Sequence, residues 1–158
     1  STSADNLLAR ARYMAKALDC EYIILDHLSI VVSAQENADE RKAIDEIMTK
    51  LRMLVAETGI SLFLVSHLRR AQGRAHEDGA RISLGELRGS QTIAQLSDIV
   101  IGMERDQQNE NEAIRNTTTV RVLKNRYTGE TGPSCYLNYD RTTGRLTEVP
   151  NPLSEGDF

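Results

Sequence analysis

The sequence predicts an α/β domain in which parallel strands alternate with helices and an antiparallel β-meander follows. Two observations lead to this prediction. In the first part of the chain, segments with apolar residues at helical spacing alternate with short continuous apolar runs, which are typical of buried parallel strands. From residue 117 the apolar residues recur at every second position between glycine-containing turns, which indicates antiparallel hairpins.

The helices are predicted where apolar residues repeat at helical spacing. The first covers residues 3–18 and the second covers residues 38–58. Gly59 stands where a helix C-cap belongs. A short third helix is expected over residues 90–96.

Three continuous apolar runs predict buried strands at residues 22–25, 60–66 and 98–104. Residues 67–83 lack apolar periodicity and are rich in arginine, so we expect a mobile loop there. Residues 106–116 are polar and are expected to form an exposed loop.

The β-meander is expected to contain three short strands, at residues 119–124, 134–139 and 145–148. Turns are expected at residues 128–132 and 142–144. We expect one domain over residues 1–148, followed by an acidic flexible tail over residues 149–158.

Composition is that of a soluble globular protein, with 40% hydrophobic and 27% charged residues among 158. No run approaches the roughly 18 apolar residues that a membrane helix needs, so no membrane association is expected. The two cysteines, Cys20 and Cys135, lie far apart in sequence, which suggests a reducing compartment.

The net charge of −4 argues against a simple basic nucleic-acid binder. The charge is unevenly distributed, however, because five arginines lie within twenty residues. A local basic strip of this kind can hold a phosphate backbone. The five are Arg69, Arg70, Arg74, Arg81 and Arg88.

Polar residues follow the three predicted parallel strands, and ligands of α/β sheets lie beyond the carboxyl ends of such strands. This rule places the pairs Asp26-His27, Ser66-His67 and Glu104-Arg105 on one rim. A carboxylate at Asp26 can hold Mg²⁺ directly or through water. Taken alone, a short apolar run followed by Asp more often marks an Asp that ends a strand or caps a helix.

His67 could contact a γ-phosphate from the same rim, although a surface His that begins a loop would look the same in sequence. Gly89 precedes a predicted helix and leaves backbone N–H groups open to an anion. With the nearby arginines it suggests a strip along a DNA backbone; the alternative is a solvated, charged loop.

Lys124 and Arg126 end a strand just before two glycines of a tight turn. An arginine on such a turn is rigidly presented and can act in trans as an arginine finger on a neighbour's nucleotide. Cross-strand charge pairing on a hairpin is the alternative.

Taken in this order, four segments resemble the phage-type bifunctional primase–helicases, a group of DnaB-like replicative helicases with a RecA-like fold. The resemblance covers about residues 19–148. The segments are residues 22–31, residues 66–68, residues 87–90 with 95–98, and residues 123–132.

The resemblance implies a role for each matching position. Asp26 matches the Walker B aspartate at the magnesium site, His67 the γ-phosphate sensor, and Arg126 the arginine finger with Lys124 beside it. Arg105 and Tyr139 match the pair that sandwiches the adenine base. The positions that match segments facing single-stranded DNA in a central channel are Arg69, Arg70, Arg74, Arg88, Gly89 and Gln95.

The implied activity is ATP-driven 5′-to-3′ translocation on single-stranded DNA and unwinding of duplex DNA by a homo-oligomeric ring, a hexamer. Mg²⁺ is the implied cofactor and ATP or dTTP the implied substrate. The acidic tail that ends in Phe158 is similar to phage tails that dock on a replicative DNA polymerase. The implied location is the cytoplasm of a phage-infected bacterial cell, or of one that carries the gene in a prophage.

The sequence departs from the family in lacking any G-x-x-x-x-G-K-[ST] phosphate loop. In the RecA-like sheet, the phosphate-loop strand lies between the strands expected here at residues 60–66 and 98–104. We therefore expect a gap at that place or an alternative pairing. We also expect the chain to be part of a longer protein and not to hydrolyse ATP alone. Ala94 stands where close relatives carry a basic residue.

Two alternatives stay open. One is a truncated, non-catalytic module that binds DNA or a polymerase. The other is a recombinase-type relative of RecA, against which the Lys-x-Arg hairpin and the Leu-Arg-Gly-Ser segment argue.

Overall fold

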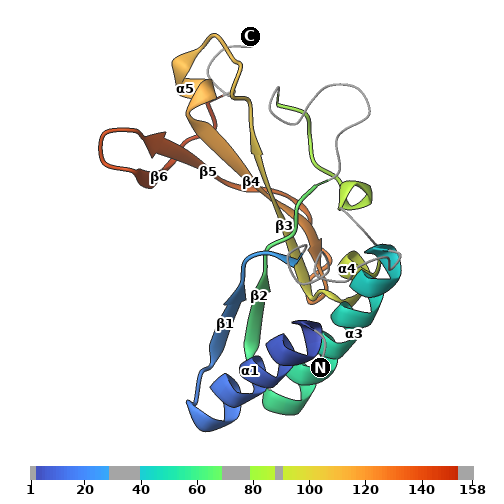
Figure 1. Ribbon diagram of the computed structural model, residues 1–158. Coiled ribbons are helices and arrows are strands. Elements are labelled where there is room, and N and C mark those ends of the chain that lie inside the picture. The colour runs from blue at the N-terminus through green and yellow to red at the C-terminus, as the bar shows by residue number, and fades with distance from the viewer. Residues whose placement is uncertain (1–2, 29–39, 69–78, 88–90, 153–158) are drawn as a thin grey trace. The chain divides into compact units, whose positions relative to one another are not determined.

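The computed structural model describes residues 3–28, 40–68, 79–87 and 91–152 (Figure 1). The chain divides into two compact units. The first unit contains residues 1–69 and 87–96, and the second contains residues 70–86 and 97–158.

The first unit contains helices α1 (Ser3–Ala17), α3 (Glu40–Thr58) and α4 (Gln91–Leu96), with strands β1 (Tyr22–Leu25) and β2 (Ser61–Leu64). The two strands pair in parallel. Their pairing continues beyond the strand ends, because the amide of Val65 donates to the carbonyl of Leu25 at 3.0 Å and that of Leu28 donates to the carbonyl of Val65 at 3.0 Å. The carboxyl ends of β1 and β2 are thereby held together.

The core of the first unit is centred on one face of α3. Side chains at helical spacing on this face are buried: Ile44, Ile47, Met48, Leu51 and Leu54. The helix stops because Gly59 adopts a φ of +73° and its amide donates to the carbonyl of Val55 at 2.8 Å. The predicted second helix and its glycine cap are confirmed over the described residues.

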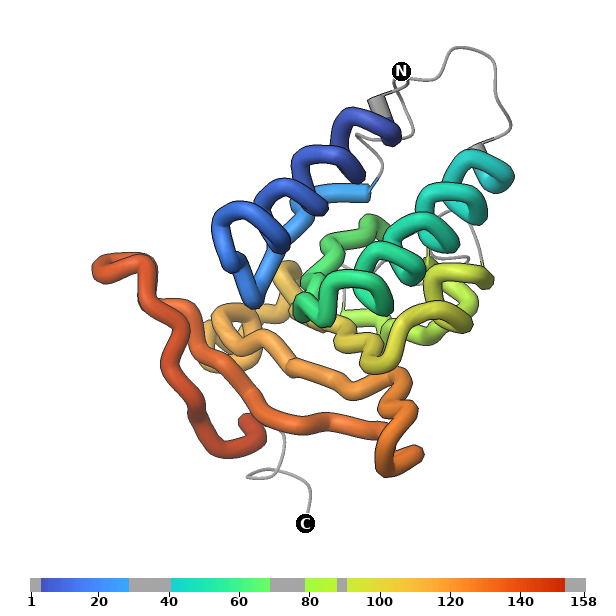
Figure 2. The backbone as a smooth tube through the Cα atoms, turned by 90° about the horizontal axis from the view of Figure 1, so that it is seen from below, coloured from blue at the N-terminus to red at the C-terminus, as the bar shows by residue number. Residues whose placement is uncertain are grey.

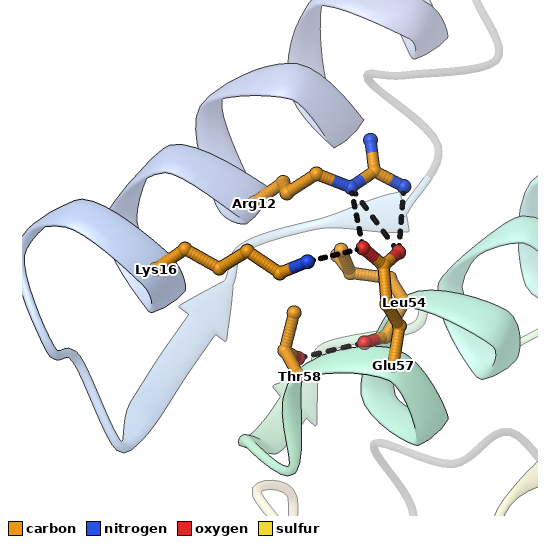
Figure 3. Close-up of polar contacts among 5 residues, drawn as sticks. All are labelled: Arg12, Lys16, Leu54, Glu57 and Thr58. Carbon is orange, nitrogen blue, oxygen red and sulfur yellow. Dashed lines mark hydrogen bonds and ion pairs between the residues drawn. The ribbon is translucent and has the colours of Figure 1, made fainter.

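A charged clamp joins α1 to α3 (Figure 3). The guanidinium of Arg12 lies 3.0 Å from one carboxylate oxygen of Glu57, and the ammonium of Lys16 lies 2.6 Å from the other. Hydrogen bonds from Arg12 and then from Lys16 lower the pKa of Glu57 to about 2. The two helices are therefore held together by a carboxylate that stays ionised in mild acid.

The clamp predicts acid-sensitive packing of α1 on α3. Because the folded-state pKa of Glu57 is depressed, its contribution is complete above its ordinary value of 4.5 and is lost as pH falls towards about 2. Glu57→Gln should lower the urea midpoint at pH 7, and the difference from the parent should shrink as pH falls through that window. Glu21→Gln, an exposed control outside the clamp, should show no such difference. A gap between Glu57→Gln and the parent that stays constant from pH 7 to pH 2 would contradict the expectation.

The second unit is an antiparallel sheet in the order β3-β4-β5-β6, which Figure 2 follows from yellow to red. Its strands are β3 (Ile99–Arg105), β4 (Thr117–Asn125), β5 (Gly132–Asp140) and β6 (Arg145–Val149). A short 3-10 helix, η1 (Leu84–Glu86), precedes β3, and helix α5 (Glu112–Arg115) connects β3 to β4. The predicted meander is confirmed, with strands one to three residues longer than expected.

The strands described form two separate sheets, and β2 is not hydrogen-bonded to β3. This is the place where the sequence predicted a gap. The α/β class with a parallel pair and an antiparallel meander is therefore confirmed. The expectation of a third parallel strand at residues 98–104 is wrong, because β3 joins the meander and pairs antiparallel with β4. None of the helices in the described parts of the chain is long and apolar enough to cross a membrane.

The expectation that residues 22–25 form a fully buried strand is wrong. Ile23 is buried, but Tyr22 and Ile24 are 65% and 73% exposed, as is Phe63 on the paired strand at 56%. Neighbouring residues of a strand project from opposite faces, so one face of the β1–β2 pair is covered and the other is not. A continuous apolar run shows that both faces of a strand are suited to burial. It does not show that other parts of the chain cover both faces.

Candidate functional site

Asp26 stands at the tip of β1. Hydrogen bonds to Val65 fix the backbone before and after Asp26. The carbonyl of Leu25 accepts a hydrogen bond from the amide of Val65, and the amide of the buried Leu28 donates to the carbonyl of Val65. The Asp26-His27 peptide bond is cis. The carboxylate itself is 73% exposed. The local fold thus presents a solvated carboxylate at the carboxyl end of a parallel strand.

His27 lies beside this carboxylate, and its ring contacts that of His67. Their ring centroids are 4.2 Å apart and the rings meet edge to face at 71°. Nδ1 of His27 lies 3.6 Å from Oδ1 of Asp26. Two of the three pairs predicted for the rim therefore stand at the ends of β1 and β2. The prediction is wrong for the third pair, Glu104-Arg105, because β3 belongs to the other sheet, where it pairs antiparallel with β4. The contact of His27 with His67 was not predicted, because the register between two strands decides it.

Asp26 suits Mg²⁺, which prefers oxygen ligands and usually binds through one or two carboxylates together with substrate phosphates. Within the described ranges, no three His, Cys, Asp or Glu side chains gather in a way that could hold a metal.

Arg105 and Tyr139, the pair to which the resemblance assigns the base, lie near each other in the second unit. The guanidinium carbon of Arg105 lies 6.0 Å from the centroid of the Tyr139 ring. A base inserted between them would need about 7 Å, two van der Waals contacts of about 3.5 Å each. A small outward shift of one side chain would therefore create the space.

A polar loop positions this pair. Nε of Arg105 donates to the carbonyl of Arg115 at 2.8 Å, and the amide of Tyr139 donates to the carbonyl of Asn116 at 2.9 Å. The two carbonyls follow each other at the end of α5. Asn111 caps that helix by accepting a hydrogen bond from the amide of Ala113 at 2.9 Å.

The expectation of an exposed loop over residues 106–116 is therefore corrected, because it contains helix α5. A helix of four residues is too short to show apolar periodicity, and its cap is the sequence signal that could have revealed it. The sequence did not reveal the role of Asn116, because that role depends on the hydrogen bond between its carbonyl and the amide of Tyr139 on β5.

Lys124 and Arg126 lie at the end of β4, where the sequence placed them. The ammonium of Lys124 donates to the carbonyl of Ser97 at 2.7 Å. Nη1 of Arg126 lies 3.1 Å from Oδ1 of Asp98, and the Arg126 side chain is 58% exposed. Both partners precede β3, so these contacts join β4 to β3 and are not the charge pairing within the β4–β5 hairpin that was considered as the alternative. The Arg126 side chain remains mostly exposed.

A part-buried ion pair supports the strand that carries Arg105. Glu104 on β3 and Arg121 on β4 are diagonal neighbours in the ladder, where Glu104 pairs with Thr119. Nε of Arg121 lies 2.7 Å from Oε1 of Glu104, and only 10% and 13% of the Glu104 and Arg121 side chains are exposed. The same carboxylate accepts a hydrogen bond from the amide of Ile82 at 2.8 Å. Pairing with Glu104 raises the pKa of Arg121 above its ordinary value.

Most positions expected to face DNA lie outside the described residues, namely Arg69, Arg70, Arg74, Arg88 and Gly89. Gln95 is described and stands exposed on α4. Leu68 and Leu87 form a β-bridge, so the chain returns to the same place after residues 69–86.

Two curated proteins are similar to this chain over most of its length. It is 46% identical over 155 residues to the DNA helicase/primase of Enterobacteria phage T3, covering 98% of this chain and 27% of that protein. It is 27% identical over 148 residues to a probable plasmid replicative DNA helicase of Chlamydia psittaci, covering 93% of this chain and 31% of that protein. The chain thus spans less than a third of either relative.

Solved structures agree on the fold. The chain matches a solved ATPase domain with a TM-score of 0.74 at 22% identity, over 94% of this chain and 52% of that one. It matches a DnaB-like replicative helicase, described with its interactions with primase, with a TM-score of 0.71 at 19% identity, over 94% and 35%. The fold is the RecA-like one of DnaB ATPase domains. Residues 1–148 match the family described as DnaB-like helicase C terminal domain, and the chain belongs to that family.

Proposed function

We propose that this chain is part of an ATP-dependent replicative DNA helicase that translocates on single-stranded DNA and unwinds duplex DNA as a homo-oligomeric ring. The observation that carries the proposal is the placement of Asp26 beside His27 and His67 at the carboxyl ends of two parallel strands. Ligands of α/β sheets bind there. Membership of the DnaB-like family gives this position its meaning and sets the recombinase alternative aside.

Each part of the nucleotide would be bound by its own group of residues. Asp26 would hold Mg²⁺, directly or through water, and the ion would neutralise charge on the β- and γ-phosphates. His67 would contact the γ-phosphate and register its loss. Arg105 and Tyr139 would hold the base by stacking, which every base supports through its π-face. The proposed substrate is therefore ATP or dTTP.

Arg126 would act on the nucleotide bound by the neighbouring subunit of the ring, a hexamer, with Lys124 beside it. Two properties of the hairpin support this role. The guanidinium is exposed, and it stands on a turn closed by a hydrogen bond from the amide of Gly129 to the carbonyl of Asn125 at 2.9 Å. An exposed arginine on a fixed turn can reach a phosphate outside its own unit.

DNA would be bound through its backbone by the arginines and polar residues that the sequence singled out. They are Arg69, Arg70, Arg74, Arg88, Gly89 and Gln95. Contacts of this kind weaken as salt rises, because each one releases counterions from DNA. A replicative DNA polymerase is the further partner proposed for the acidic tail at residues 149–158.

The test uses the intact protein that contains this chain. ATP hydrolysis is measured with and without single-stranded DNA, and strand displacement is measured on a forked duplex with ATP or a non-hydrolysable analogue. We expect DNA to stimulate hydrolysis and unwinding to require hydrolysable nucleotide. Binding of single-stranded DNA without hydrolysis or unwinding would reject the motor and favour a non-catalytic binding module.

A further inference from the structure

The corner where β3 begins and β4 ends fixes the backbone of the proposed finger. Ile99 pairs with Asn125 in the β3–β4 ladder. One step further, the amide of Arg126 donates to the carbonyl of Asp98 at 2.8 Å. Arg126 therefore leaves the sheet from a position that Asp98 determines.

The turn beyond β4 is closed by its own hydrogen bonds. The side-chain oxygen of Asn125 accepts the amides of Tyr127 at 3.0 Å and Thr128 at 3.3 Å. Gly129 allows the turn through its φ of +74°. With the backbone held on both sides, the freedom left to Arg126 lies in its side-chain torsions.

Asp98 also restricts those torsions. Its Oδ1 accepts a hydrogen bond from Nη1 of Arg126 at 3.1 Å. Asp98 is 30% exposed and Arg126 is 58% exposed, so the carboxylate holds one edge of the guanidinium while other donors face solvent. A guanidinium carries five donors in a rigid fork, and its open edge can still bind phosphate oxygens.

We propose that Asp98 is a positioning residue for the arginine finger, one that holds the Arg126 guanidinium in the direction from which it reaches a neighbouring subunit's nucleotide. This inference rests on the proposed function of Arg126. Asp98 acts through Arg126 and need not touch the nucleotide. An exposed ion pair of this kind is weak, so the guanidinium can turn towards a phosphate without a large loss.

The test compares Asp98→Ala, Asp98→Asn and Glu130→Ala in the intact ring. Asp98→Ala should lower kcat for ATP hydrolysis about 2-fold to 5-fold, because an exposed ion pair contributes up to about 1 kcal/mol and about 1.4 kcal/mol corresponds to a factor of ten. The KM for ATP should stay unchanged. Asp98→Asn keeps an oxygen acceptor and should recover much of the kcat. Glu130→Ala, an equal charge change in the same turn, should behave like the parent.

A double variant separates positioning from a general structural effect. If Asp98 acts through Arg126, adding Asp98→Ala to Arg126→Ala should lower kcat no further. A second loss of the same size in the double variant would overturn the inference, as would an Asp98→Asn value no higher than that of Asp98→Ala.

The outcomes also distinguish this inference from the proposed function. Parent-like kcat in Asp98→Ala, with hydrolysis lost in Arg126→Ala, would overturn the positioning role alone. Parent-like kcat in Arg126→Ala would reject the finger itself and the positioning role with it.

Discussion

Arg126→Ala is expected to lower kcat for ATP hydrolysis in the intact ring by about 10³-fold to 10⁵-fold, the range that an arginine finger contributes. Nucleotide binding should persist, because the proposal assigns the base and the magnesium ion to other residues. The structure supports this expectation with an exposed guanidinium on a turn closed by hydrogen bonds. Single-turnover hydrolysis and equilibrium binding of a fluorescent nucleotide measure the two quantities separately.

The matched control is Arg141→Ala. Arg141 is an exposed arginine at the next turn of the same meander, between β5 and β6. The control removes the same charge from the same sheet and should leave kcat near that of the parent. Equal hydrolysis by Arg126→Ala and the parent would reject the finger.

Mixed rings test action in trans. Subunits with Arg126→Ala keep a complete nucleotide site and lack the finger, whereas subunits with Asp26→Asn keep the finger and lack the magnesium ligand. Rings that contain both should regain hydrolysis, because a parent-like Arg126 then faces an intact site across some interfaces. Mixed rings as inactive as either pure ring would argue that Arg126 serves its own subunit.

Glu104→Ala is expected to destabilise the second unit by about 3 kcal/mol, the lower end of the cost of removing one partner from a buried ion pair. The lower end applies because a tenth of each side chain is still exposed. The variant would leave the Arg121 charge without its partner and the amide of Ile82 without its acceptor. Hydrogen exchange measured on peptides that contain residue 82 should accelerate roughly a hundredfold, since about 1.4 kcal/mol corresponds to a factor of ten.

The double variant Glu104→Gln with Arg121→Met identifies the cause. Gln keeps an acceptor for the Ile82 amide, and Met removes the charge that would otherwise be buried alone. The double variant should therefore recover most of the protection from hydrogen exchange at residue 82. Glu148→Gln, on exposed β6, serves as the control. Parent-like exchange in Glu104→Ala would show that the pair contributes little.

Loss of the Glu104–Arg121 ion pair should also affect the Arg105–Tyr139 pair, because Glu104 lies next to Arg105 on β3. Glu104 precedes Arg105, and its carboxylate holds the backbone of Ile82 against β3. The segment that contains Ile82 also approaches the end of this strand closely, because a Cβ on Gly79 would lie 2.9 Å from the Cβ of Asp106. Loosening this contact would therefore also disturb the strand that presents Arg105 to Tyr139.

The order of helices and strands could be predicted from sequence because each element carries its own periodicity. The stripe of α3, the cap at Gly59 and the alternation of the meander all arise between residues close in the chain. The positions of Asp26 and His67 at strand ends could be predicted for a related reason. Each ends an apolar strand, and parallel strands bring their carboxyl ends to one rim.

Only the tertiary structure decided which side chains contact one another. That Asp98 holds Arg126, that Glu104 meets Arg121, and that His27 touches His67 all depend on the register between strands distant in sequence. Burial was decided in the same way, because an apolar run does not say which of its faces is covered, and Ile24 is exposed although its sequence suits a core. Local pattern determined which elements form in this protein, whereas pairing across the chain determined which side chains meet, since hydrogen bonds between strands fix positions that no local spacing encodes.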